Sequence, residues 1–357
     1  MKAYYFFITL LSFVLIFSCK TEKEAPEIPI LKLEEVLEGD KVLELSDICS
    51  KIETVQLETN DDILINRIAN VILSNKNIIV VHDNLCSVFD LDGNYIRKIS
   101  SKGQGPEEYI SIDNVFISGD TVRIADFSKR KIHAFNLDGS FLFSIEVPAN
   151  LVFATAFDEL FFCYRPNRSG SETTKLYFID RIGNLLDSIP NQNLYENPSG
   201  IISIYYDEVF MYQFDVSINM KEMANDTLFA VSKDRTISPL YIFDLGKYAP
   251  KEKERYVTNL QEPSFQGKKL FSLLLETTSH FVINARLEKD RYILYDKKTK
   301  SLENVAFRYN DEMISKFGKE FFNPKYVTHE GKTFCSHEVS ADIDNDDNPV
   351  LIFATFL

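Results

Sequence analysis

The residues of this chain whose types and spacing could do chemistry begin with one loop, SKGQGPEEY, at positions 101–109. Glycines beside carboxylates suggest either a phosphate-binding loop or an acid–base pair. A phosphate loop places a lysine and a hydroxyl on the anion, whereas this loop has carboxylates in their place. Glu107 and Glu108 are neighbours in an extended loop, so their side chains point apart and make poor partners for proton transfer. We therefore interpret the segment as a sharp turn between two units of structure.

This interpretation gives most residues of the turn a structural role. The two glycines are expected to supply unusual backbone dihedrals, the proline to stiffen the turn and the tyrosine to pack as an anchor. The glutamate before the tyrosine is left without a role and is the open position of the loop. The candidate loop residues are Gly103, Gly105, Pro106, Glu108 and Tyr109.

A second group of carboxylates, DIDNDDN at 342–348, could hold a metal ion. Asp342, Asp344 and Asp346 have the spacing of the first ligands of a calcium loop. An EF-hand would continue with glycine and, six positions later, glutamate, but the chain has Asp347 and Phe353 there. The spacing excludes an EF-hand. We predict a polar hairpin and no cofactor, with a looser calcium cage as the alternative.

Histidine and cysteine show no short-range site. No H-x-x-x-H spacing occurs, so the sequence predicts no zinc site unless the fold brings distant histidines together. No C-x-x-C pair occurs either, and we expect the four cysteines beyond position 40 to be buried apolar side chains, with their disulfide state left open. The histidines are His82, His133, His280, His329 and His337, and these cysteines are Cys49, Cys86, Cys163 and Cys335.

The N-terminus has the pattern of an export signal. Lys2 supplies a basic start, and residues 4–17 form an apolar stretch that is too short to cross a bilayer comfortably. The small Ser18 before Cys19 resembles the cleavage box of bacterial lipoproteins, although the two residues before Ser18 depart from the usual pattern. The resemblance implies that Cys19 carries the lipid. An ordinary secretory signal is the alternative.

These features predict three segments and a place in the cell. The charged, proline-containing stretch after Cys19 should be flexible. We expect an exported protein held at a membrane, the outer membrane being preferred, through its lipid alone. The segments are a signal peptide at 1–18, a tether at 19–40 and a folded domain at 41–357.

Composition narrows the class of partner. The 357 residues carry a formal net charge of −14, and such an acidic surface repels the phosphates of nucleic acids. Hydrophobic residues make up 45% of the chain, which is enough for a sizeable core. The chain has no tryptophan, so sugar stacking would depend on tyrosine and phenylalanine. We expect a monomer that does not bind nucleic acid.

Internal repeats indicate the elements that position these residues. A strand–turn–strand pattern with a glycine turn recurs around Gly93, Gly139 and Gly183, about 45 residues apart. Period-two alternation between such turns predicts antiparallel hairpins, and four strands in such a repeat make a propeller blade. We therefore predict an all-β fold, a six-bladed β-propeller.

The ends of the predicted domain should meet. The last blade is short of one strand, and we expect the N-terminal strand at 51–59 to pair with the C-terminal strand at 348–357 and close the ring. Two helical insertions are predicted, at 249–261 and 310–324. They should lie on one rim near the channel mouth, or else only cover blade edges.

The segment from Gly103 to Leu142 is similar to NHL-type repeats. It has a glycine loop, a strand that ends in "IAD", then "RKI", and then a phenylalanine followed after two residues by "DG". The whole chain resembles the six-bladed propeller lipoproteins of polysaccharide-degrading Gram-negative bacteria. It departs from their loop pattern at Glu107, where they usually have glycine. The resemblance implies the fold and the cell envelope, and it implies no particular activity.

The function predicted is therefore binding. We expect a non-enzymatic, lipid-anchored module that presents its rim or funnel to an envelope protein, a peptide or a glycan. The alternative is a propeller enzyme, a lyase or hydrolase, with histidines holding a metal in the central channel. Converging histidines would favour the enzyme.

Overall fold

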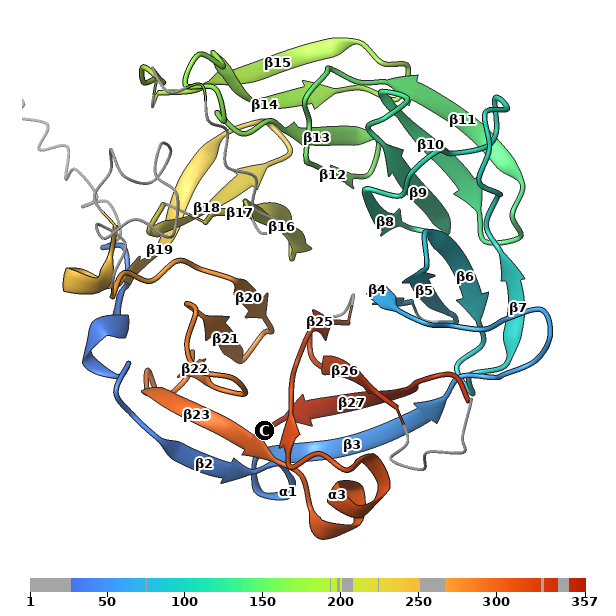
Figure 1. The fold of residues 1–357 in the computed structure, drawn as a ribbon. Helices are drawn as coiled ribbons and strands as arrows, with labels where there is room; N and C mark the ends of the chain where they lie inside the picture. Colours follow the sequence, from blue (N-terminus) through green and yellow to red (C-terminus); the bar gives the residue numbers. More distant parts are fainter. Residues whose placement is uncertain are drawn as a thin grey trace, which may run out of the picture.

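A computed structural model describes residues 27–357 apart from positions 75, 193, 198–199, 201–207, 224, 251–266, 329–330 and 340–346. Its strands form six sheets arranged as a ring (Figure 1). Each sheet is one blade of a propeller. The predicted all-β fold with six blades is thus confirmed.

Blades 1 to 3 have four antiparallel strands each, given from the centre of the ring outward. Blade 1 consists of β4 (Ile68–Leu73), β5 (Ile78–His82), β6 (Leu85–Phe89) and β7 (Tyr95–Lys98). Blade 2 consists of β8 (Asn114–Ser118), β9 (Thr121–Asp126), β10 (Lys131–Asn136) and β11 (Phe141–Glu146). Blade 3 consists of β12 (Phe153–Phe157), β13 (Leu160–Tyr164), β14 (Thr174–Ile179) and β15 (Leu185–Pro190).

Blades 4 to 6 take strands from the N-terminal part of the chain as well. Blade 4 consists of β16 (Val209–Phe214), β17 (Ser217–Glu222), β18 (Thr227–Ser232), β19 (Ile237–Asp244) and β1 (Ile30–Lys32). Blade 5 consists of β20 (Leu273–Glu276), β21 (His280–Asn284), β22 (Tyr292–Asp296), β23 (Leu302–Arg308), β2 (Lys41–Glu44) and the short β24 (Phe321–Phe322). Blade 6 consists of β25 (Tyr326–Val327), β26 (Phe334–Glu338), β27 (Val350–Phe356) and β3 (Cys49–Gln56).

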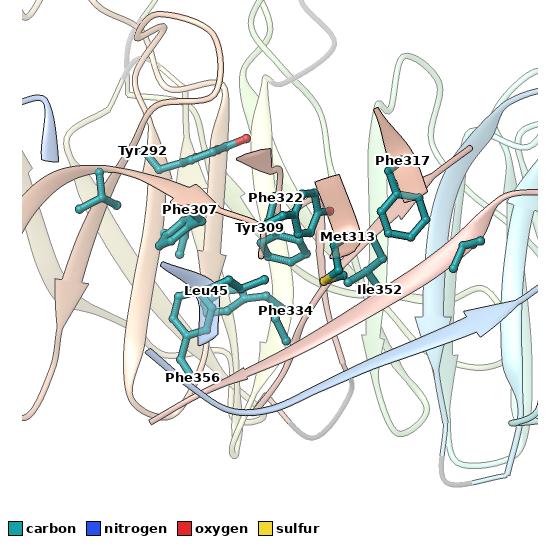
Figure 2. Close-up of a cluster of buried hydrophobic side chains, with 14 residues drawn as sticks. Leu45, Tyr292, Phe307, Tyr309, Met313, Phe317, Phe322, Phe334, Ile352 and Phe356 are labelled. Atoms are coloured by element: carbon teal, nitrogen blue, oxygen red, sulfur yellow. The ribbon is translucent and has the colours of Figure 1, made fainter. Parts of the chain in front are cut away.

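Each junction between neighbouring blades contains one cluster of buried apolar side chains. The alternating sequence of the strands produces this arrangement, because each blade has an apolar face toward both neighbours. Phenylalanine fills these junctions: Phe307 of blade 5 meets Phe356 of blade 6 with ring centroids 5.2 Å apart (Figure 2). The core is therefore a ring of six interfaces around a central axis.

The ring closes as the sequence predicts. β3 pairs antiparallel with β27, with Gln56 opposite Val350 and Val55 opposite Leu351. The last blade supplies only three strands of its own, and β3 is its outermost strand. This pairing joins a strand from the N-terminal part of the chain to the C-terminal strand in one sheet.

The segment before β3 differs from the prediction. β1 and β2 add parallel outer strands to blades 4 and 5, and the 3-10 helix η1 (Leu33–Glu35) lies between them. Leu31, Leu33 and Leu37 are buried in the junction of these two blades. The flexible tether predicted at 19–40 is therefore too long, because folded structure begins by Ile30. A three-residue strand is too short for alternation to reveal.

Two α-helices occur in the described part of the chain, α1 (Leu45–Ile48) and α3 (Asp311–Phe317). α3 confirms a helix within the stretch predicted at 310–324, but the helix ends at Phe317, and Phe321–Phe322 form the strand β24. Asn310 caps its start by accepting from the Met313 backbone N–H, and Gly318 ends it with a left-handed φ of 63°. It lies at the outer edge of the ring and buries Met313 and Phe317 between blades 5 and 6 (Figures 1 and 2). It thus covers a blade edge and lies away from the channel mouth.

Most of the other predicted helix, 249–261, lies outside the described residues. So do the predicted signal peptide and Cys19. Among the residues that the structure describes, no helix is long and apolar enough to cross a membrane.

Candidate functional site

The innermost strands of all six blades surround one cavity with a volume of about 540 Å³. β4, β8, β12, β16, β20 and β25 each contribute to its wall (Figure 1). The wall combines apolar and polar residues, and its apolar surface is somewhat the larger. Its apolar residues include Phe116, Phe153, Phe210, Phe214 and Leu273. A cavity of this size with such a mixed wall suits an organic ligand.

Polar residues from several blades lie among these apolar ones. Asn70 and Gln213 line the cavity, and neither side chain makes a hydrogen bond to another described residue. Their amides therefore keep donors and acceptors available for a ligand. Thr155 and Ser272 lie on the same wall. Polar groups placed sparsely in an apolar pocket orient a ligand and provide specificity.

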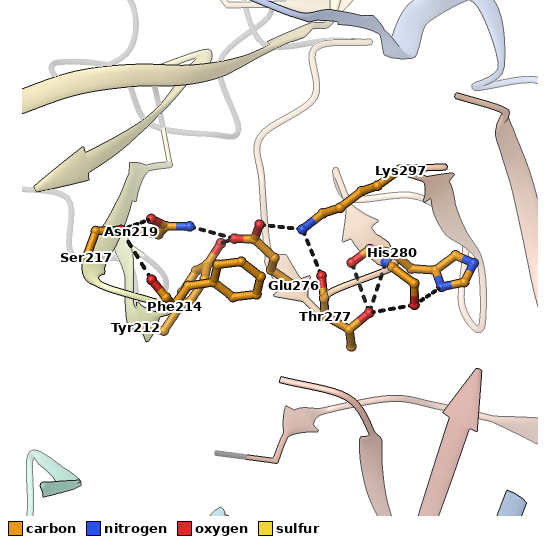
Figure 3. Close-up of polar contacts among 9 residues, drawn as sticks. Tyr212, Phe214, Ser217, Asn219, Glu276, Thr277, His280 and Lys297 are labelled. Atoms are coloured by element: carbon orange, nitrogen blue, oxygen red, sulfur yellow. Dashed lines mark hydrogen bonds and ion pairs between the residues drawn. The ribbon is translucent and has the colours of Figure 1, made fainter. Parts of the chain in front are cut away.

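A buried carboxylate lies in this wall between blades 4 and 5 (Figure 3). Oε2 of Glu276 accepts hydrogen bonds from the Tyr212 hydroxyl and the Asn219 amide, both at 2.7 Å. Oε1 accepts from the Lys297 ammonium at 2.6 Å. The Glu276 side chain is 3% exposed. Because donors from two blades satisfy both oxygens, this carboxylate joins the blades and has little capacity left for chemistry.

Burial affects the ionisable partners of Glu276, and it lowers the pKa of Lys297. Burial, followed by the charge of Glu276, raises the pKa of Tyr212 well above its ordinary value, so this phenol keeps its proton. Lys297 also donates to the Thr277 carbonyl at 2.7 Å and lies over the Phe281 ring at 4.4 Å. These hydrogen bonds and ion pairs around Glu276 hold blades 4 and 5 together.

A lysine, Lys325, is also among the residues that line the cavity. Lys325 precedes β25, is exposed, and its Nζ lies 3.1 Å from Nε2 of His337. Burial, together with the charges of Lys325 and Lys319, lowers the pKa of His337 to about 4. The imidazole is therefore neutral at pH 7 and accepts from the ammonium. Tyr326 stacks on the His337 ring at 6.0 Å and fixes its orientation.

The candidate loop at 101–109 joins blades 1 and 2, as the turn interpretation requires. Tyr109 is fully buried in the junction between these blades, which confirms its role as an anchor. Lys129 of blade 2 donates to the carbonyls of Gly105 and Glu108, at 3.0 and 2.7 Å. The loop lies outside the residues that line the cavity.

The role predicted for the two glycines is wrong. Neither Gly103 nor Gly105 has a positive φ, so neither is needed for an unusual dihedral. Instead, a Cβ at either position would overlap the carboxylate of Glu108, whose Oε2 accepts from the Gly105 N–H at 2.8 Å. The glycines make room for Glu108, and Glu108 is therefore the organising side chain of the turn.

The histidines do not converge within the described residues. His82, His133 and His280 are buried within blades, and His337 lies behind Lys325. None of these four lines the cavity, and among the described residues no three His, Cys, Asp or Glu side chains form a group that could hold a metal ion. His329, Asp342, Asp344 and Asp346 lie outside the described residues.

The four cysteines of the described chain are free thiols. Cys86, Cys163 and Cys335 are buried, as predicted, while Cys49 is half-buried on β3. Burial raises the pKa of the Cys49 thiol to about 12. None of these sulfurs is poised to act as a nucleophile.

Comparison with known proteins agrees with this architecture. A putative exported protein from Bacteroides fragilis has a similar structure, with a TM-score of 0.65, 17% identity, and 89% of this chain and 99% of that chain covered. A member of the DUF4221 family from Bacteroides vulgatus has a TM-score of 0.51 at 11% identity, covering 87% of this chain and 97% of that one. These likenesses show the fold. No curated protein matches the chain.

One family model does match, and it is described as a domain of unknown function, DUF4934. The match runs over residues 28–355 and so includes the N-terminal strands β1 to β3 as well as the six blades. Because it spans nearly the whole described propeller, the chain belongs to the DUF4934 family.

Proposed function

We propose that this protein is a binding module of the cell envelope whose central cavity takes an apolar organic ligand, such as a short peptide segment. The observation that carries the proposal is the cavity of about 540 Å³ with apolar walls from all six blades. A packed propeller axis would leave no such space.

The chemistry of the wall favours a peptide over a glycan. A sugar presents many hydroxyl groups, and each would need a polar partner in the cavity. The wall offers phenylalanine and leucine residues beside its polar groups, and the side-chain amides of Asn70 and Gln213 are among the polar groups left for a ligand. Apolar peptide side chains would bury favourably there, and the two amides would meet the peptide backbone.

Binding in the cavity is tested with the neutral apolar dye N-phenyl-1-naphthylamine. We expect a saturable rise in its fluorescence with the wild-type protein. Ala69 is an exposed residue of the cavity wall, and Ala69→Trp should fill the space and weaken binding at least tenfold. The matched control is Ile182→Trp, which adds the same ring to a turn of blade 3 where the side chain is 76% exposed.

Dye binding that is unchanged in Ala69→Trp would place the site outside the cavity and contradict the proposal. Thermal unfolding of both variants checks that they are folded. A wild-type protein with no saturable dye binding would likewise contradict it.

We further propose that the protein is exported and held at a membrane through a lipid on Cys19, preferably at the outer membrane. The sequence of residues 1–19 supports this, and the similar Bacteroides fragilis structure is described as a putative exported protein. Cys19→Ser should move the protein from the membrane fraction to the soluble envelope fraction. Retention of the variant in the membrane fraction would rule out lipid anchoring at this position.

A further inference from the structure

Lys325 differs from every other residue on the wall of the cavity. It is the only lysine or arginine among the described residues that line this space. It also has no carboxylate within salt-bridge distance among these residues, whereas the nearby cation Lys297 is held 2.6 Å from Glu276.

Glu338, whose charge acts on Lys325, already has a partner. Glu338 is 1% exposed and forms its ion pair with Lys319. The group of Lys319, Lys325 and Glu338 therefore has a net charge of +1, with His337 neutral. Of these three residues, Lys325 is the one that lines the cavity.

His337 holds the ammonium in place without neutralising it. Its Nε2 accepts one of the three N–H donors of Lys325 at 3.1 Å, which leaves two donors for a ligand. The imidazole proton then lies on Nδ1, 3.5 Å from the Tyr326 hydroxyl. A lysine side chain loses much rotamer entropy when it binds, and a partner that already restrains it lowers this cost.

We infer that Lys325 is the anion-binding group of the cavity and that the ligand carries a carboxylate on an apolar body. This rests on the proposed function of the cavity. One ammonium with two free donors matches one carboxylate. A dianionic phosphate is disfavoured, because the other charged residues of the wall, Asp113 and Glu276, are acidic.

The carboxylate could be the C-terminus of a peptide or belong to a small organic acid, and matched probes separate these sources. N-acetyl-leucyl-phenylalanine is compared with its C-terminal amide, and 4-phenylbutyrate with 4-phenylbutanamide, by titration calorimetry. We expect the wild-type protein to bind at least one acid about tenfold more tightly than its amide, which corresponds to about 1.4 kcal/mol. The preference should shrink at high salt.

Lys325→Met should abolish this preference and leave the amide affinity unchanged, while Lys325→Arg should keep most of it. Lys289→Met is the matched control, because Lys289 is exposed and lies outside the cavity wall. Acid and amide binding with equal affinity to the wild type, or a preference that survives in Lys325→Met, would overturn the carboxylate site alone. If neither the probes nor the naphthylamine dye bind, the proposed function fails with it.

Discussion

At the scale of single residues, Glu108 shows how one carboxylate can determine a loop. Its side chain accepts from the Gly105 N–H, and its own carbonyl accepts from Lys129 of the next blade. Glu107 beside it is exposed, and only its backbone carbonyl is engaged, by the Ser100 hydroxyl. Two adjacent residues of the same type thus have different roles.

Removal of the Glu108 carboxylate should therefore destabilise the turn. We expect Glu108→Ala to lower the free energy of unfolding by about 1 kcal/mol, since a charge-assisted hydrogen bond in a half-buried site is lost. Urea unfolding followed by circular dichroism measures the change. Glu107→Ala is the control and should stay within about 0.5 kcal/mol of the wild type. Equal effects of the two variants would disprove the role given to Glu108.

His133 gives a prediction about pH. It is 1% exposed, and neither ring nitrogen has a hydrogen-bond partner among the described residues. Burial lowers its pKa below the ordinary 6.5. The unfolded chain therefore binds a proton that the folded chain does not, and the free energy of unfolding falls as the pH drops below about 6.5, by at most about 1.4 kcal/mol per pH unit for one site.

His133→Leu removes this proton uptake. The difference in unfolding free energy between wild type and variant should shift steadily in favour of the variant between pH 7 and pH 5. His82, His280 and His337 also have lowered pKa values, but they titrate in both proteins and cancel in the difference. A difference that does not change with pH would show that His133 is not a neutral buried group.

At the scale of elements, the N-terminal segment is a belt, which we define as β1, η1, β2 and α1, along the outer edges of blades 4 and 5. Leu33 is fully buried in the belt, whereas Ile30 of β1 is 57% exposed. The belt covers strand edges that would otherwise be open to pairing with another chain. It belongs to the folded domain.

Two substitutions distinguish a packed belt from a flexible tether. Leu33→Ala should lower the free energy of unfolding by about 2–4 kcal/mol, because it opens a cavity in the core between blades 4 and 5. Ile30→Ala should change it by less than about 0.5 kcal/mol. Thermal and urea unfolding measure both. A Leu33→Ala protein as stable as the wild type would mean that the belt does not contribute to the fold.

Strands and helices were predictable from the sequence where their residue patterns extend over enough positions to be recognised. Strand alternation and recurrent glycine turns indicate the blades, and Asn310 with Gly318 marks α3. β1 was not predicted, because a strand of three residues is too short to show an alternating pattern. The reason why positions 103 and 105 are glycine was not predictable either. The sequence shows the glycines, but it does not show that the Glu108 side chain occupies the space of a Cβ. Contacts across space decide such positions.

At the scale of the whole molecule, Asn348 joins the end of the chain to its beginning. Its amide nitrogen donates to the carbonyls of Glu58 and Ile63, and its amide oxygen accepts from the Ile65 N–H at 2.7 Å. The residue is 2% exposed. It fixes the segment between β3 and β4 against the start of β27.

We expect Asn348→Ala to lower the free energy of unfolding by about 3 kcal/mol or more, because three backbone groups lose their partner, two of them in buried hydrogen bonds. Asn348→Asp keeps the shape but turns the two donors into acceptors, so it should also destabilise the protein. Thr54→Ala, on the exposed face of β3, is the control. If Asn348→Ala behaved like the control, ring closure would not depend on this amide.

The cavity is the part of the molecule that was least predictable from the sequence. Six segments spread over the chain line it, and alternation alone does not tell which residue of an innermost strand faces the axis. Lys325 and His337 stand in no recognisable motif, and only the hairpin of β25 and β26 brings them together. The shape of the protein was predictable, and the chemistry of its centre was not.

The closure of the ring also determines when β3 can pair during synthesis of the chain. Gln56 of β3 bonds to Asn348, 292 residues later, so β3 cannot find its partner in blade 6 until that part of the chain has been synthesised. Such long-range pairing makes folding slow. The waiting strand, CSKIETVQ, exposes Ser50, Lys51, Glu53 and Thr54. Its polar character keeps a lone strand from joining the wrong neighbour during that delay.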